Sequence, residues 1–329
     1  MWGPEQHEAV AIVGMGCRWP GGVRNAPELW EFLVNKVDGW REFDEPQFST
    51  RGFYHPNSDR PGTMYMRGAF LADEDARLFD HSFFGMTRLE VDTLDPSQRK
   101  LLEVTYEAIE NAGETWESVS GSRTGIFVGN FCLDHWMIQS RDWDNPRPYA
   151  FTGAGTSILA NRISYIFNFQ GPSLTVDSAC SSSMYALHLA VNAIRAGDCD
   201  SAIVASANWI ADPGVQIALD KLGALSASSR CHTFDARAEG YARGEGYGAI
   251  YLKRPSLAIE QQSPIRAMIR GTAINSNGRT GGITRPTIGR GLGFGPGFWA
   301  QIWALRKPTL SPRHTNQSIQ KGLGPLSKK

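Results

Sequence analysis

The chain has 329 residues, of which 41% are hydrophobic and 20% charged, and its 33 basic residues balance 33 acidic ones. This composition is typical of a globular protein, and there is neither a run of about 18 apolar residues nor a signal-peptide-like start. We therefore expect a cytoplasmic protein that has neither a membrane nor a nucleic acid as its partner.

Segments with strand and helix patterns alternate along most of the chain. Apolar runs predict six strands: residues 10–15, 124–128, 172–176, 201–207, 248–252 and 265–272. Apolar residues at helical spacing predict four helices: residues 26–35, 97–111, 155–167 and 183–194. Residues 40–66, rich in Pro, Gly, Asp and Arg, predict a long ordered loop. The alternation predicts an α/β layered fold around a central sheet.

Cys180 lies where a predicted strand turns into a predicted helix. Unpaired backbone N–H groups and the helix dipole favour a thiolate there, and the small Ala and Ser neighbours leave room for a substrate carbonyl. A buried structural cysteine is the alternative interpretation. The other four cysteines lack this context and are expected to be structural: Cys17, Cys132, Cys199 and Cys231. Their irregular spacing favours a reducing compartment and matches neither a disulfide framework nor a zinc or other metal site.

Residues 177–183 (DSACSSS) resemble the nucleophile signature of the β-ketoacyl synthases, the condensing enzymes of fatty-acid and polyketide synthesis. Four further blocks resemble the family in the same order: residues 10–22, 83–113, 152–171 and 234–248. The sequences of these blocks are most similar to the synthase domain of a fungal-type reducing, iterative polyketide synthase. The resemblance implies a thiolase-like αβαβα fold, two sheets around a central helical layer. Residues 1–287 would hold the complete first half, to about residue 252, and the start of a truncated second half at 265–287.

The resemblance also implies the chemistry. Cys180 would take an acyl group from the phosphopantetheine arm of an acyl carrier protein, and a malonyl thioester would then lose carbon dioxide and condense with it. No cofactor would be bound, and a homodimer is expected. The residues that would line or support the acyl pocket are Thr152, Gly153, Gly155, Asp177, Arg243 and Glu245. We expect an internal ion pair between Arg243 and Glu245, and a packing role for His188 on the helix after Cys180.

The C-terminal part of the sequence departs from the family. The family's two histidines, one in a His-Gly-Thr-Gly-Thr segment, have no counterpart here, and His314 lies near the right distance only in an unrelated context. Residues 261–329 hold 11 Lys or Arg and no acidic residue. Residues 288–329 therefore form a divergent basic tail. It is interpreted as a polyanion-binding segment, a genuine ending or, preferably, an out-of-frame end of a longer gene, because the resemblance stops abruptly.

Three functions remain open on the sequence. The first is a polyketide synthase β-ketoacyl synthase region that lacks full activity alone because the partner histidines are missing. The second is a non-catalytic remnant that dimerises with an intact synthase, and the third is a basic-tailed binding protein. A sheet without its second half predicts an uncovered apolar face, and so poor solubility or dependence on a partner.

Overall fold

The computed structural model describes residues 8–43, 50–72, 76–142, 144, 147–276, 278–279 and 281. The end of the family resemblance, at residues 282–287, and the predicted basic tail at residues 288–329 lie outside the described residues. His314 lies in that tail. The fold below is therefore that of the described part of the chain.

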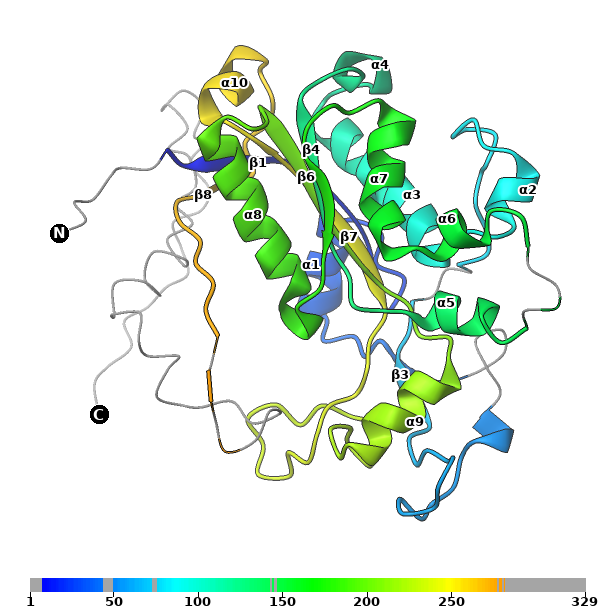
Figure 1. Ribbon diagram of the computed structural model, residues 1–329. Helices are drawn as coiled ribbons and strands as arrows, with labels where there is room; N and C mark the ends of the chain where they lie inside the picture. The colour runs from blue at the N-terminus through cyan, green and yellow to red at the C-terminus, as the bar shows by residue number, and fades with distance from the viewer. Residues whose placement is uncertain are drawn as a thin grey trace, which may run out of the picture.

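Within these residues, a mixed six-stranded sheet forms the centre of the molecule (Figure 1), with the order β5-β4-β6-β7-β1-β8. The strands are β1 (Val10–Arg18), β4 (Thr124–Gly129), β5 (Ser173–Val176), β6 (Ser201–Asn208), β7 (Gly246–Lys253) and β8 (Ala267–Ile269). β4 is parallel to β5 and β6, whereas β7 is antiparallel to β6 and β1, and β8 is antiparallel to β1. The carboxyl ends of β4, β5 and β6 therefore meet at one edge of the sheet.

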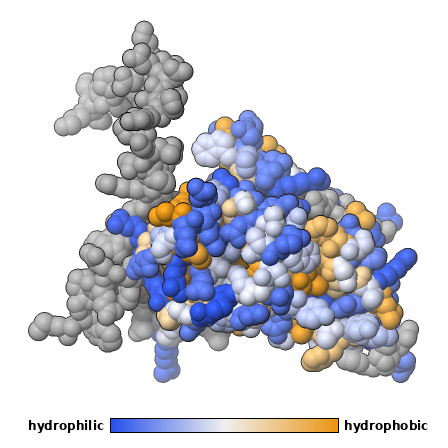
Figure 2. All heavy atoms as spheres, turned by 90° about the horizontal axis from the view of Figure 1, so that it is seen from above, coloured by the Kyte–Doolittle hydropathy of each residue, from blue (hydrophilic) through white to orange (hydrophobic). Residues whose placement is uncertain are grey.

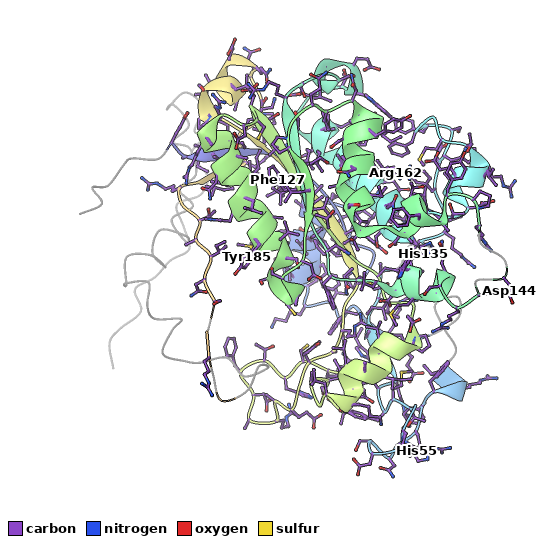
Figure 3. All side chains as sticks on the ribbon, viewed as in Figure 1. His55, Phe127, His135, Asp144, Arg162 and Tyr185 are labelled. Carbon is purple, nitrogen blue, oxygen red and sulfur yellow. The ribbon has the colours of Figure 1, made fainter. Side chains whose placement is uncertain are left out.

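Helices cover both faces of the sheet, which confirms the predicted layered α/β architecture (Figure 1). α3 (Pro96–Asn111) and α7 (Thr156–Phe167) pack on one face, and α8 (Ser182–Ala196) packs on the other. The strand period of two separates the two cores. Ile126 and Val128 of β4 join the core under α3 and α7, whereas Phe127, labelled in Figure 3, joins the core under α8.

Local sequence explains the bounds of α3. The Asp95 carboxylate caps its first turn by accepting a hydrogen bond of 2.7 Å from the Ser97 N–H, and Pro96 occupies the start of the helix. Gly113, directly beyond the C-cap, has a φ of 80°, a left-handed conformation that glycine adopts without steric cost. The predicted helix over residues 97–111 is confirmed.

Shorter elements surround these layers: α1 (Ala26–Val34), β2 (Trp40–Glu42), η1 (Thr50–Gly52), β3 (Gly68–Phe70), α2 (Arg88–Val91), α4 (Trp116–Val119), α5 (Asp134–Gln139), α6 (Ala150–Ala154), η2 (Ala179–Ser181), α9 (Pro213–Lys221) and α10 (Pro255–Glu260). β2 and β3 pair as a separate antiparallel sheet. The prediction of a continuous loop over residues 40–66 is therefore wrong at β2 and η1. Short elements like these carry no full period of apolar residues, so the pattern does not reveal them.

Met184, Leu187, Leu189, Val191 and Ile194 have the spacing of a buried helix in the sequence, but they form only part of the buried face of α8. Val191 and Ile194 are buried as expected, but the rest of the face consists of Ala186, Ala190 and Ala193. Met184 is 58% exposed and Leu189 36% exposed, so their expected burial is wrong among the described residues. Alanine has no long side chain, and a row of alanines lets the helix axis lie close to the sheet.

An extended segment, residues 270–275, runs along the outer side of α8 (Figure 1). Three hydrogen bonds hold it: Tyr185 Oη to the Asn275 carbonyl (2.8 Å), His188 Nδ1 to Thr272 Oγ1 (2.8 Å) and Arg195 Nη2 to the Arg270 carbonyl (3.1 Å). Figure 3 shows Tyr185 on this side of the helix. Because His188 Nε2 also bonds to Asn192 (2.9 Å), both nitrogens of this histidine have structural partners.

The expected bare sheet face is not found, because helices cover both faces of the sheet within the described residues. Exposed apolar side chains lie on helices and in loops, and one group of them lies on α1. No residue of α1 is buried, and Trp30, Leu33, Val34 and, just beyond its end, Val37 form an exposed apolar stripe at helical spacing. On the face shown in Figure 2, hydrophobic residues lie among hydrophilic ones. No helix of the described residues is long and apolar enough to cross a membrane.

Candidate active site

Cys180 lies on a tight elbow between strand β5 and helix α8. The chain leaves β5 at Val176, passes through the 3-10 turn η2 and enters α8 at Ser182. Ala179 has a φ of 56°, a left-handed conformation that costs an L-residue about 1–2 kcal/mol. Asp177 stabilises this turn, since its Oδ1 accepts a hydrogen bond of 2.9 Å from the Ala179 N–H. The elbow leaves the Cys180 thiol exposed.

The serines of the signature complete the elbow. Ser182 Oγ accepts a hydrogen bond from the Ser178 N–H (2.9 Å) and donates one to the Ala179 carbonyl (2.6 Å). Ser181 Oγ donates to the Ser178 carbonyl (2.9 Å). These two hydroxyls thus bond to backbone groups of the turn, which gives Ser181 and Ser182 a structural role in the elbow.

Exposure separates Cys180 from three of the other four cysteines. Cys180 and Cys231 are exposed free thiols, whereas Cys17, Cys132 and Cys199 are buried. Burial raises the pKa of Cys199 to about 11 and also raises the pKa values of Cys17 and Cys132. A raised thiol pKa lowers the fraction of reactive thiolate. The expected structural role suits these three thiols, and Cys231 Sγ accepts a hydrogen bond from the Ala242 N–H (3.3 Å).

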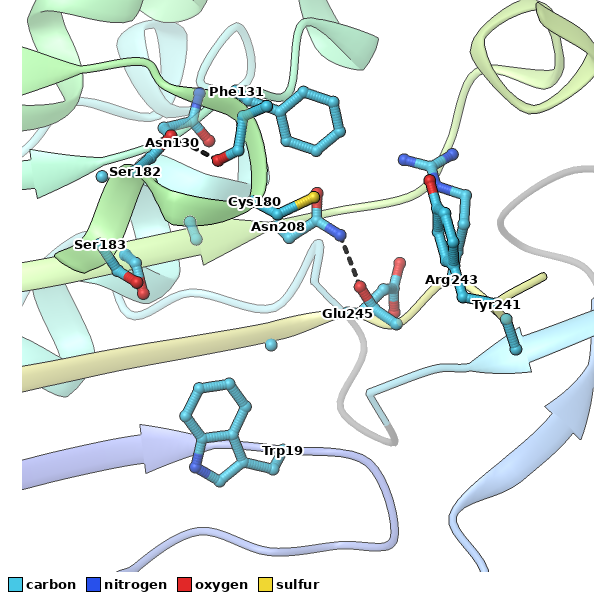
Figure 4. A pocket seen from close by; sticks show the side chains of 17 residues that line it. Trp19, Asn130, Phe131, Cys180, Ser182, Ser183, Asn208, Tyr241, Arg243 and Glu245 are labelled. Atoms are coloured by element: carbon cyan, nitrogen blue, oxygen red, sulfur yellow. Dashed lines mark hydrogen bonds between the residues drawn. The ribbon is translucent and has the colours of Figure 1, made fainter. Parts of the chain in front are cut away.

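The Cys180 thiol opens into a cavity of about 300 Å³ (Figure 4). Four parts of the chain line it: the end of β4 with Asn130, the elbow itself, the end of β6 with Asn208, and residues 241–246. The indole of Trp19 closes one side, packed so tightly on Gly246 that a Cβ atom there would lie 2.3 Å from the ring. Sequence reasoning missed Asn130 and Asn208, although polar residues at the ends of buried strands are a recognisable signal.

Arg243 and Glu245 both line this cavity, but they do not form the expected ion pair. The Glu245 carboxylate accepts hydrogen bonds from the backbone N–H groups of Ala72 and Ile210, each of 2.9 Å. Arg243 Nη1 donates to Gln216 Oε1 over 3.4 Å. Glu245 therefore connects its own segment to those of Ala72 and Ile210. Its carboxylate bonds to their backbone N–H groups and not to Arg243.

The other predicted residues do not line the Cys180 cavity within the described part of the chain. Thr152 and Gly153 are in α6, where the Gln98 amide donates to both of their carbonyls (3.1 and 2.8 Å). Gly153 also permits a close approach, because a Cβ atom there would lie 2.2 Å from the Thr93 carbonyl oxygen. Gly155 follows α6 as its C-cap. Their place in an acyl pocket remains a prediction.

A second cavity of about 420 Å³ adjoins the first and shares Asn130 and Phe131 with it. Asp177 lines this second cavity, together with Thr156 and Ser157, which directly follow the predicted pocket residue Gly155. Asp177 thus contacts the second cavity while its carboxylate holds the elbow. The described residues contain no group of three or more His, Cys, Asp or Glu side chains arranged to hold a metal ion.

Comparison with known proteins agrees with this geometry. Residues 7–258 match the family model described as Beta-ketoacyl synthase, N-terminal domain. Prosolanapyrone synthase of Alternaria solani is 65% identical over 279 residues, which cover 85% of this chain and 11% of that protein. The highly reducing polyketide synthase xilA of Penicillium rubens is 65% identical over 284 residues, 86% of this chain and 12% of that protein.

Solved structures support the same assignment. An oxazolomycin ketosynthase domain from Streptomyces albus is similar with a TM-score of 0.78 and 33% identity, covering 84% of this chain and 47% of that one. A ketosynthase from module 6 of the Bacillus subtilis bacillaene synthase is similar with a TM-score of 0.78 and 31% identity, covering 85% of this chain and 46% of that one. The thiolase-like fold and the resemblance to fungal reducing synthases are confirmed, although the chain spans only a small part of its curated relatives. The chain belongs to the β-ketoacyl synthase family, whose N-terminal domain it matches over most of its length.

Proposed function

We propose that the chain acts in polyketide synthesis as the acyl-accepting part of a β-ketoacyl synthase, with Cys180 as the nucleophile. The observation that carries this proposal is the exposed Cys180 thiol at the head of α8, held by a left-handed elbow and open to a cavity. An elbow of this kind keeps a nucleophile accessible while the helix behind it stays packed. The names of the fungal relatives support a polyketide as the product.

The first step is acyl transfer. The Cys180 sulfur attacks the carbonyl carbon of an acyl thioester carried on the phosphopantetheine arm of an acyl carrier protein. The bond from that carbon to the pantetheine sulfur breaks, the pantetheine thiol takes the proton that Cys180 gives up, and the acyl group stays on Cys180. The Cys180 backbone N–H would donate to the oxyanion of the intermediate, because N–H groups at the start of a helix lack intrahelical acceptors.

The second step is condensation with a malonyl thioester. The malonyl group loses carbon dioxide, and the two electrons of the broken bond form an enolate of the carrier-bound thioester. The enolate carbon attacks the acyl carbon on Cys180, a carbon–carbon bond forms, and the Cys180 thiolate leaves. The product is a 3-oxoacyl thioester on the carrier. Both partners, the acyl carrier and the malonyl carrier, are part of this proposal.

A second copy of the chain is the other partner that we propose. β5 is an edge strand of the sheet, and the adjoining helices expose large apolar side chains, Phe151 of α6 and Tyr165 of α7. Aromatic residues exposed beside a free strand edge are suited to contact with another molecule. Sedimentation equilibrium of the full chain would test this, with a dimer as the expected species and a monomer at all concentrations as the contrary result.

Acyl transfer can be tested directly. The full chain would be incubated with an acyl-pantetheine thioester, digested, and the acylated peptides identified by mass spectrometry. We expect the acyl group on Cys180 and no acylation in Cys180→Ala. Cys231→Ala is the matched control, because Cys231 is the other exposed free thiol of the described residues. Equal acylation of Cys231 and Cys180 in the unchanged protein would refute the proposal.

A further inference from the structure

Arg243 is a buried cation without a matching anion. Its side chain is only 4% exposed, and Nη2 has no hydrogen-bond partner. The one contact of its Nη1 is the long hydrogen bond to the neutral amide of Gln216. No carboxylate of the described residues lies within ion-pair distance of this guanidinium. Burying a charge in this way is costly unless a partner compensates it.

Neither of the two nearby carboxylates pairs with Arg243. Glu245 accepts from two backbone N–H groups. Asp220, one turn beyond Gln216 on α9, accepts from the Tyr65 N–H over 2.9 Å with Oδ2, and its buried Oδ1 has no hydrogen-bond partner. An internal anion therefore does not neutralise Arg243 in the described part of the protein. A bound molecule with an anionic group would compensate this charge.

Arg243 lies at the Cys180 cavity. It is one of the lining residues, and Figure 4 shows the Cys180 thiol pointing toward the side on which Tyr241 and Arg243 lie. The hydroxyl of Tyr241 interacts electrostatically with both Cys180 and Arg243. Burial raises the pKa of its hydroxyl, a negative charge on Cys180 raises it further, and the charge of Arg243 lowers it. A ligand joined to the Cys180 sulfur, or about to react there, would thus share one cavity with the guanidinium.

The proposed function supplies one anionic group that enters such a cavity. A malonyl thioester carries its carboxylate one methylene from the thioester carbonyl. The phosphate of the pantetheine arm lies at the opposite end of the arm from its sulfur, so it stays outside when the thioester is inside. The unpaired Oδ1 atoms of Asn130 and Asn208 in the same cavity are acceptors and would repel a carboxylate, which leaves the Arg243 side for it.

We propose that Arg243 binds the free carboxylate of the malonyl thioester and so selects carboxylated units over plain acyl thioesters. This inference rests on the proposed function and names the substrate group that the site recognises. A guanidinium matches a planar carboxylate with two donors. Because the contact is made to the substrate before carbon dioxide leaves, Arg243 is a binding residue. In the condensation its loss would raise KM for the malonyl thioester more than it lowers kcat.

Two alkylating reagents test the site without any condensation. Iodoacetate and iodoacetamide react with a thiol in the same way, but iodoacetate carries a carboxylate one methylene from the sulfur that it modifies. The rate at Cys180 would be measured for each reagent by peptide mass spectrometry. We expect the iodoacetate-to-iodoacetamide ratio to fall about tenfold in Arg243→Gln and less in Arg243→Lys, as for loss of a charge-assisted hydrogen bond.

Controls come from the same chain. Arg237→Gln removes an exposed arginine that is paired with Asp235, and it should leave the ratio at Cys180 unchanged. The ratio at Cys231 should not change in any variant. An unchanged ratio at Cys180 in Arg243→Gln, or an equal fall in Arg237→Gln, would overturn the proposal.

A second measurement needs no variant, in case Arg243→Gln does not fold. Malonate should protect Cys180 of the unchanged protein from iodoacetamide at concentrations where malonamide does not, and equal protection by both would overturn the proposal. The outcomes also separate this inference from the proposed function. If the ratio falls in Arg243→Gln but Cys180 is not acylated, the carboxylate site stands and the proposed acyl transfer is rejected. If Cys180 is acylated but the ratio does not change, acyl transfer stands and the carboxylate site is rejected.

Discussion

A Cβ atom on Gly129 would lie 2.4 Å from the backbone nitrogen of Ser183, so the end of β4 and the first turn of α8 are in direct backbone contact. Gly129 is therefore a requirement for the position of Cys180, which precedes that turn. Any larger residue has to move the start of the helix. The strand end and the nucleophile elbow are one unit.

Gly129→Ala should destabilise the protein by about 1–3 kcal/mol, as expected for overpacking, and slow the alkylation of Cys180. Urea unfolding and the rate with iodoacetamide would measure the two effects. Gly52→Ala is the control, because a Cβ atom at Gly52 meets nothing within 4 Å. Equal losses in the two variants would show that the close approach does not matter.

The Asp177 carboxylate should act through its hydrogen bond to the Ala179 N–H, not through its charge. Asp177→Ala should cost about 1 kcal/mol of unfolding free energy, because the left-handed Ala179 loses the group that holds it. Asp177→Asn keeps an acceptor oxygen and should cost much less. Urea unfolding of both variants tests this, and an equally large loss in Asp177→Asn would point to the charge.

Two leucines on different helices should respond differently to truncation. Leu101 of α3 is fully buried, and Leu101→Ala should cost about 2–5 kcal/mol of unfolding free energy. Leu33 of α1 is 60% exposed, and Leu33→Ala should change stability by less than about 0.5 kcal/mol. Denaturant unfolding measures both. A large loss in Leu33→Ala would mean that something covers α1 in solution.

The buried Tyr247 hydroxyl has no hydrogen-bond partner within the described residues. Burial, together with the nearby charge of Glu245, raises the pKa of Tyr247 well above its usual value of 10.0. As pH rises, the unfolded chain loses this proton before the folded one does. The contribution of the protonated Tyr247 hydroxyl to the free energy of unfolding is therefore fully present below about pH 10 and decreases above that pH. Tyr247→Phe should unfold with equal or greater free energy at pH 7, by up to about 1 kcal/mol, and lose less of it above pH 10.

Tyr65, whose hydroxyl donates to the Leu225 carbonyl over 3.0 Å, is the matched control for this prediction. Burial raises its pKa too. Tyr65→Phe removes a satisfied hydrogen bond and should cost about 1 kcal/mol at pH 7. Unfolding at pH 7 and pH 10.5 would compare the two variants. A loss of more than about 1 kcal/mol in Tyr247→Phe at pH 7 would contradict the assignment of an unpaired hydroxyl.

The long elements of this fold were predictable because burial imposes a period on them. β4, β6, α3 and α8 occur where the apolar patterns indicated, within two residues at each end. Of the predicted strand over residues 265–272, only β8 (Ala267–Ile269) forms. It is an edge strand of the sheet and pairs with β1. Helix α6 was missed, and the Gln98 amide holds its backbone by a tertiary contact. Helix α9 was missed although Asp212 and Pro213 give it a recognisable local start.

The candidate site was only partly predictable. The pattern around Cys180 and the glycine-rich stretch at residues 240–246 do meet at one cavity. The contacts within it were not predictable, because Glu245 takes its partners from residues 72 and 210, which only the fold brings near. Because the Glu245 carboxylate bonds to these two N–H groups, it does not form the ion pair with Arg243 that the sequence predicted.

The segment at residues 270–275 fixes the direction in which the chain travels. Its hydrogen bonds to Arg195, His188 and Tyr185 follow α8 backwards, from the far end of the helix toward the end that carries Cys180. Asn275 therefore lies beside Tyr185 in the first turns of α8, and a one-residue deletion within the segment would shift it along the helix by about 3.3 Å.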